Sequence, residues 1–152
     1  MAYSDADARQ QLLDELAGAT DALAVALSAL GEAYELLDDQ TADRLEEQLF
    51  RPVQAAYGRA KRTHAEFAAR HDLPSRAFAP ASQGHPSQGV KGFVDGAVAA
   101  VAQADGRIGT LQDSLLPVEF GDAELRAGLS EVRRQLGDVP GRAREFGRTL
   151  GR

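Results

Sequence analysis

Several residues that support common site chemistry are scarce or missing. The chain of 152 residues has no cysteine, which excludes disulfide bonds, thiolate metal sites and a cysteine nucleophile. This lack fits a reducing compartment, and we expect a cytoplasmic protein. The histidines are only His64, His71 and His85. The first two are about 10 Å apart along a helix, too far to share one metal ion. Neither has the Glu-x-x-His spacing of di-iron bundles, so the sequence predicts no metal and no cofactor.

Catalytic and targeting motifs are missing as well. No serine has the context of a nucleophile elbow, and no glycine-rich loop of the nucleotide-binding type occurs. The first residues do not join a basic segment to an apolar one, so we expect no signal peptide. No apolar run approaches the roughly 18–20 residues of a membrane span, and none is expected. These absences favour a non-enzymatic protein and give no candidate catalytic residue.

What the chain does have is a regular spacing of apolar residues by three and four positions. Residues at this spacing share one side of a helix. The spacing occurs in three segments, at Leu13, Leu16, Thr20, Leu23, Leu27, Leu30, Tyr34 and Leu37, at Val90, Val94, Ala97, Val101, Ala104, Ile108, Leu111 and Leu115, and at Leu125, Leu129, Val132, Leu136, Val139, Ala143, Phe146 and Leu150. Three such stripes predict an all-α fold, specifically an up-down-up-down four-helix bundle that forms a single domain over residues 1–152.

The predicted helices span residues 5–38, 41–72, 88–116 and 122–150. Ser4, Thr41 and Asp122 are the expected N-caps. Pro52 interrupts the second helix, so either this helix kinks there or a short helix ends near Phe50 and another begins. Residues 137–141 interrupt the fourth helix around Pro140. The apolar phase continues across them, which predicts a kink or a closely stacked pair of helices.

Residues 73–89 form the clearest loop, because they are rich in proline, glycine and serine. This segment is longer than a usual connection between bundle helices. It is expected to cross the end of the bundle or to cover a site, with Phe78 as the residue that anchors it.

The net charge of −6 is unevenly distributed. Residues 1–50 carry twelve acidic residues and two arginines, whereas residues 51–92 carry two acidic and seven basic residues. Mutual attraction of the first two helices is one explanation, and a partner site is the other. Arg59 and Arg62 are three residues apart and form a weak candidate anion clamp. The pI near 5.0 disfavours nucleic acid as a partner.

Polar and aromatic residues on the packing faces are the remaining site candidates. Tyr57, His64 and Phe67 fall in phase on the second helix, and Tyr34 lies on the first stripe. They form either a hydrogen-bonded polar layer or an internal small-molecule site roofed by the 73–89 loop. Alanines border the first stripe and widen its apolar face. We therefore expect the main function to be self-association, such as a homodimer, or the binding of a partner helix.

Overall fold

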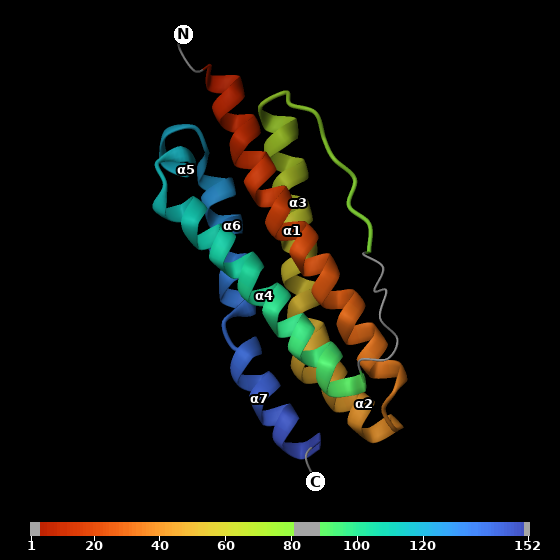
Figure 1. The fold of residues 1–152 in the computed structure, drawn as a ribbon. Helices are drawn as coiled ribbons and strands as arrows, with labels where there is room; N and C mark the ends of the chain where they lie inside the picture. Colours follow the sequence, from red (N-terminus) through yellow and green to blue (C-terminus); the bar gives the residue numbers. More distant parts are fainter. Residues whose placement is uncertain (1–3, 81–88, 151–152) are drawn as a thin grey trace.

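The computed structural model describes residues 4–80 and 89–150, and all regular secondary structure in these ranges is helical (Figure 1). The all-α prediction is confirmed. The helices are α1 (Asp5–Glu35), α2 (Asp39–Leu45), the π-helical turn η1 (Glu46–Phe50), α3 (Arg51–Arg70), α4 (Gly89–Asp113), α5 (Leu116–Glu119), α6 (Ala123–Leu136) and α7 (Val139–Leu150).

Side-chain caps begin three of these helices. The Ser4 hydroxyl accepts a hydrogen bond from the Asp7 amide (3.0 Å), and the Asp122 carboxylate accepts one from the Leu125 amide (2.8 Å). These two predicted N-caps are confirmed. The third prediction is wrong, because Asp38 rather than Thr41 is the N-cap of α2. Its carboxylate accepts a bond from the Thr41 amide (2.9 Å), so α1 ends earlier and α2 begins earlier than expected.

The predicted irregularities take different forms at the two prolines. Before Pro52 the chain makes a π-helical turn, in which the Arg51 amide donates to the Glu46 carbonyl five residues earlier. Proline has no amide hydrogen and its ring crowds the carbonyl four residues before it, and a wider turn accommodates both effects. The extra residue in this turn also shifts the phase of the apolar residues between Leu49 and Val53. Near Pro140 the chain forms two successive helices, α6 and α7.

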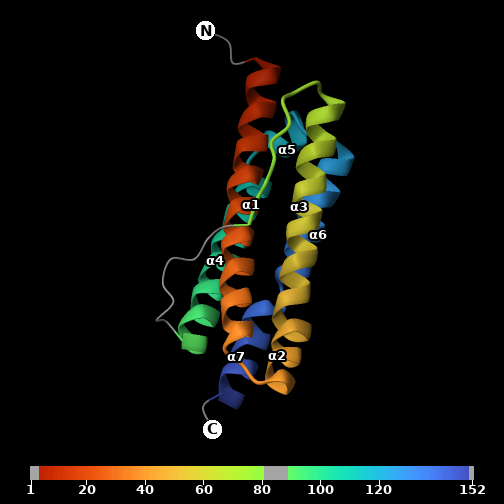
Figure 2. The same ribbon diagram turned by 90° about the vertical axis from the view of Figure 1, so that its right-hand side faces the viewer.

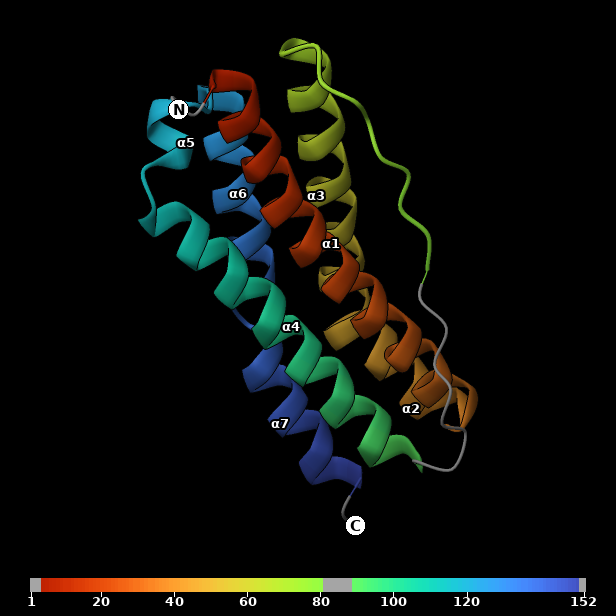
Figure 3. The same cartoon turned by 45° about the horizontal axis from the view of Figure 1, so that its top comes forward.

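Contacts between side chains show the relative direction of the helices. Arg70, at the end of α3, pairs with Asp122 at the start of α6, so these two helices are antiparallel. Asp105 in the later part of α4 pairs with Arg133 of α6. The start of α4 lies across a groove from the end of α7. Hence α4 also opposes the α6–α7 direction, and α3 and α4 run the same way (Figure 3). The expected up-down-up-down order is therefore not confirmed.

The loop after α3 explains this order. Its described part, residues 71–80, turns back along α1 and α3 instead of crossing directly to the next helix (Figure 2). The chain thus travels the length of the molecule before α4 begins. Residues 81–88, the rest of the predicted loop, lie outside the described residues.

The predicted stripes form the core. α1 packs against α3 and α4, α3 packs against α6, and α7 contacts α4 and η1. Nearly all stripe positions are buried or half-buried, and the exceptions, Tyr34 and Leu115, lie at helix ends. Among the described residues, α1 is long and apolar enough to cross a membrane by length and composition. In its most apolar window 61% of the residues are buried inside the molecule, as in a core helix.

Candidate interaction groove

The four predicted ligand-binding residues do not converge. Tyr57, His64 and Phe67 are buried along α3, but Tyr34 is 37% exposed in the last turn of α1. The Phe67 ring lies against the His71 ring, with 4.4 Å between centroids, at the end of α3 that is distant from Tyr34. An internal site of the predicted composition is therefore not assembled, and only Tyr57 and His64 remain as its possible lining.

His64 is covered by the loop that follows α3. The edge of one ring meets the face of the other between His64 and Phe78, with centroids 5.2 Å apart, so Phe78 does anchor the loop. Burial lowers the pKa of His64, the nearby Arg76 charge lowers it further, and Asp14 opposes them. The imidazole is therefore held in its neutral form. Its Nδ1 atom has no hydrogen-bond partner among the described residues.

Tyr57 lies two helical turns before His64, on the same face of α3. The Lys61 ammonium sits 4.4 Å from the centroid of its ring, a cation–π contact. Burial raises the pKa of the phenol, and the Asp21 carboxylate adds to this effect. Asp21 in turn pairs with Arg76 of the loop (3.0 Å). The buried Tyr57 hydroxyl has no partner among the described residues, so this layer is not the fully hydrogen-bonded one that the sequence allowed.

The anion clamp of Arg59 and Arg62 stays a prediction, and the structure shows the surroundings of each residue. Arg59 is half-buried and close enough to Glu131 of α6 for its charge to lower the pKa of that carboxylate, after the larger effect of Arg134. Arg62 is exposed. The two arginines therefore differ in exposure, and Arg59 is the one close enough to influence an acidic residue of α6.

A charged cluster joins the end of α3 to the start of α6. Both nitrogens of the Arg70 fork donate to Asp122 (2.7 and 2.8 Å), and the His71 Nε2 atom lies 3.0 Å from the same carboxylate. Burial raises the pKa of Asp122, but the bonds from Arg70, Leu125 and His71 outweigh burial and lower this pKa to about 2. Because Asp122 is also an N-cap, the cluster has a structural explanation.

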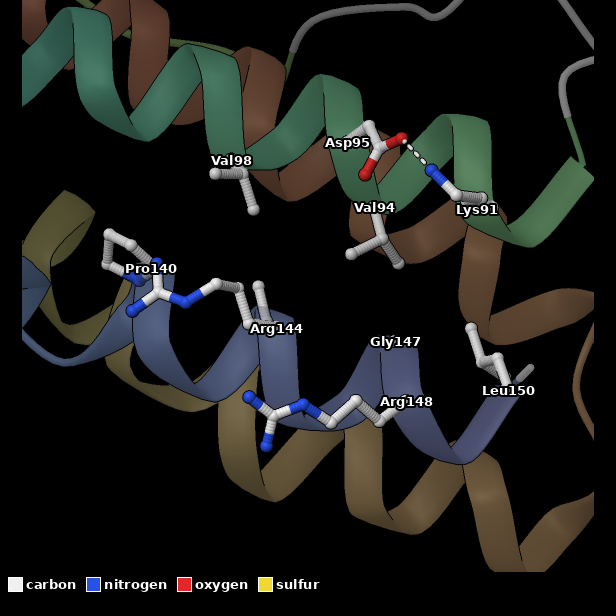
Figure 4. A pocket seen from close by; sticks show the side chains of 10 residues that line it. Lys91, Val94, Asp95, Val98, Pro140, Arg144, Gly147, Arg148 and Leu150 are labelled. Atoms are coloured by element: carbon white, nitrogen blue, oxygen red, sulfur yellow. Dashed lines mark hydrogen bonds and ion pairs between the residues drawn. The ribbon is translucent and has the colours of Figure 1, made fainter. Parts of the chain in front are cut away.

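A groove lies between α4 and α7 (Figure 4). Its volume is about 670 Å³, and it is open along one side. Val94 and Val98 project from α4 toward α7, where Pro140, Ala143 and Leu150 complete apolar walls. The α7 backbone comes close to this space at Gly147, where a Cβ atom would meet no other atom within 4 Å.

Cationic side chains line the rim of this groove. Arg144 and Arg148 both project from α7. Arg148 pairs with Glu145 (2.9 Å) and Lys91 pairs with Asp95 (2.8 Å), whereas Arg144 has no ion pair or hydrogen bond with any described residue. An apolar floor with an unpaired guanidinium at its edge suits a ligand that is both apolar and acidic.

A smaller hollow of about 300 Å³ lies on the other side of α7, beside η1. Arg44, Gln48, Arg142 and Glu145 surround it, together with Phe146 and Thr149 of α7. The Arg44 guanidinium donates to the Thr149 hydroxyl across it (3.3 Å). α7 is thus flanked by a hollow on each side and buries only three of its own residues, Val139, Ala143 and Phe146.

Comparison with known proteins gives no indication of function. No protein-family model, curated protein or solved structure matches this chain. Within residues 4–80 and 89–150, no group of histidine, aspartate and glutamate side chains could hold a metal ion. The surfaces of the described residues therefore carry the information on function.

Sequence reasoning missed the groove, although one signal of it was available. Val98 is apolar but falls outside the α4 stripe, four residues after Val94. An apolar residue beside a stripe indicates a second packing surface. What could not be read from the spacing was that α7 would leave this surface partly uncovered.

Proposed function

We propose that this protein is a four-helix bundle with one long crossover connection, and that it acts by binding another protein chain rather than by catalysis. The supporting observation is the α4–α7 groove. Its walls are apolar, whereas the rim carries Arg144 without an ionic partner among the described residues. Protein interfaces are enriched in arginine and commonly pair an apolar centre with a charged rim. Cytoplasmic localisation remains part of this proposal.

The occupant of such a groove is expected to be an amphipathic segment with acidic residues. Its apolar side chains would cover Val94, Val98 and Leu150, and its carboxylates would meet Arg144 and Arg148. Helix-in-groove binding of this kind uses apolar anchors one or two helical turns apart. The unpaired charge adds specificity and speeds encounter more than it adds affinity.

A photo-cross-linking amino acid at position 147 tests this function in cells. Gly147 borders the groove and Gly96 lies outside its lining, yet both are exposed helical glycines with open space around a Cβ atom. We expect position 147 to cross-link to one defined protein chain, either a second copy or another protein. The matched variant at position 96 should not. Equal cross-linking at both positions would contradict the proposal.

A second measurement separates groove binding from chance proximity. The cross-linked protein, once purified, should bind Arg144→Glu at least about tenfold more weakly than wild type, a loss of roughly 1.4 kcal/mol. Arg62→Glu makes the same charge change on an exposed part of α3 and should leave binding unchanged.

A further inference from the structure

We propose that the partner in the groove is a second copy of this chain, and that the second copy inserts the acidic corner between its α1 and α2 helices. The acidic corner is defined as residues 32–39. This inference rests on the proposed function, because it requires the α4–α7 groove to be a docking site. It adds the identity of the occupant and the symmetry of the complex.

The acidic corner has the chemistry that the groove requires. Tyr34 and Leu36 are 37% and 54% exposed, and they lie only two residues apart in this corner. Glu32, Glu35 and Asp39 surround them on the surface, and the segment contains no basic residue. The corner therefore presents apolar groups surrounded by negative charge, whereas the groove presents apolar groups beside positive charge.

Electrostatics within one copy leave this corner unsatisfied. The carbonyl end of a helix carries partial negative charge, so acidic residues there are unfavourable and a cation is favourable. The last turn of α1 contains no basic residue. Glu32 and Glu35 have no ion pair with any described residue. An arginine from a second copy would relieve the repulsion that one copy contains.

The positions of the two surfaces allow a closed dimer. Arg44 of α2 contacts Thr149 of α7, so the acidic corner and the groove lie toward the same end of the molecule (Figure 1). A two-fold axis at that end pairs each corner with the groove of the other copy. The contact is then made twice, which increases the buried area without extending the assembly into a fibre.

Charge reversal gives a decisive test by sedimentation velocity over a concentration series. Wild type should dimerise, and Arg144→Glu and Glu35→Arg should each weaken self-association at least about tenfold. Mixed in equal amounts, these two variants should dimerise as well as wild type, because both contacts in the mixed dimer join opposite charges. The double variant in one chain should also recover. Arg62→Glu is the charge control, and circular dichroism checks folding.

Three results would overturn the inference. They are a wild type that stays monomeric at every concentration, single variants that associate as wild type does, and a mixture that fails to recover. Cross-linking at position 147 separates these failures from failure of the proposed function. A cross-link to a different protein would leave the groove as a docking site and exclude the second copy. A cross-link within one chain would exclude both.

Discussion

Among single residues, Asp122 connects more parts of the fold than any other side chain described above. It caps α6, binds both nitrogens of the Arg70 fork and contacts His71. Its pKa of about 2 means that the folded state favours the carboxylate. Stability from this group is therefore complete above the unfolded pKa near 3.8, and it is lost as the pH falls through about 2.

We predict that Asp122→Asn lowers the free energy of unfolding by about 2 kcal/mol at pH 7. Asparagine is as good an N-cap as aspartate, so the variant removes the charge and keeps the cap. Urea unfolding across a pH series measures the effect. The difference from wild type should be constant above pH 4 and shrink toward zero near pH 2, in line with the pKa shift.

Asp95→Asn is the matched control for this prediction. Asp95 pairs with Lys91 at a similar distance, but both side chains are largely exposed, and water screens such pairs. Its loss should change the free energy of unfolding by less than about 0.5 kcal/mol. An equal effect at both positions would mean that the Asp122 cluster adds nothing beyond an ordinary surface pair.

Between elements, α3 and α6 come close together at a buried glycine of α6. A Cβ atom at Gly128 would overlap the hydroxyl of Thr63, and both residues are buried. The absence of a side chain at position 128 therefore allows the two helices to pack against each other. Glycine is otherwise unfavourable inside a helix by roughly 1 kcal/mol relative to alanine.

We predict that Gly128→Ala destabilises the protein by about 1–3 kcal/mol, because steric overlap outweighs the gain in helix propensity. Gly106→Ala, where a Cβ atom meets no other atom within 4 Å, should instead be neutral or stabilising. Thermal unfolding of both variants gives the comparison. Adding Thr63→Ala to Gly128→Ala should recover part of the loss, and a lack of coupling between the two would contradict the steric explanation.

Element boundaries show what the sequence could predict. The apolar stripes identified the core faces of α1, α4, α6 and α7, because helical period is a local property. Ser4 and Asp122 were found as caps for the same reason. The shared direction of α3 and α4 could not be predicted, since loop length does not fix the path of a loop. The separation of Tyr34 from His64 depends on helix ends and packing, which the period does not determine.

At the scale of the whole molecule, acidic residues of α1 form ion pairs with basic residues of distant segments. Ion pairs of α1 reach Arg107 of α4 and Arg76 of the loop after α3. The attraction of α1 to α3 that the charge pattern suggested stays a prediction, because these ion pairs join α1 to other elements. The central position of α1 also explains its apolar composition. Neighbouring helices cover 61% of the residues in its most apolar window.

We predict that the folded protein does not associate with lipid bilayers, even though α1 is long and apolar enough to span one. Most of the apolar window of α1 is buried against its neighbours α3 and α4 and is therefore not available to lipid. Flotation with neutral phospholipid vesicles measures this, and the protein should remain in the dense fraction. Comigration with the vesicles at neutral pH would show that α1 leaves the core for the membrane.

The parallel course of α3 and α4 has a consequence for what the molecule can connect. Arg9, near the start of α1, contacts the Phe120 carbonyl beside α5, whereas Leu150 lies by the start of α4. The two ends of the described fold are therefore at opposite poles (Figure 1). α1 alone, with 31 residues, is about 45 Å long. A surface near the start of α1 and a surface near the end of α7 are therefore kept apart along the length of α1.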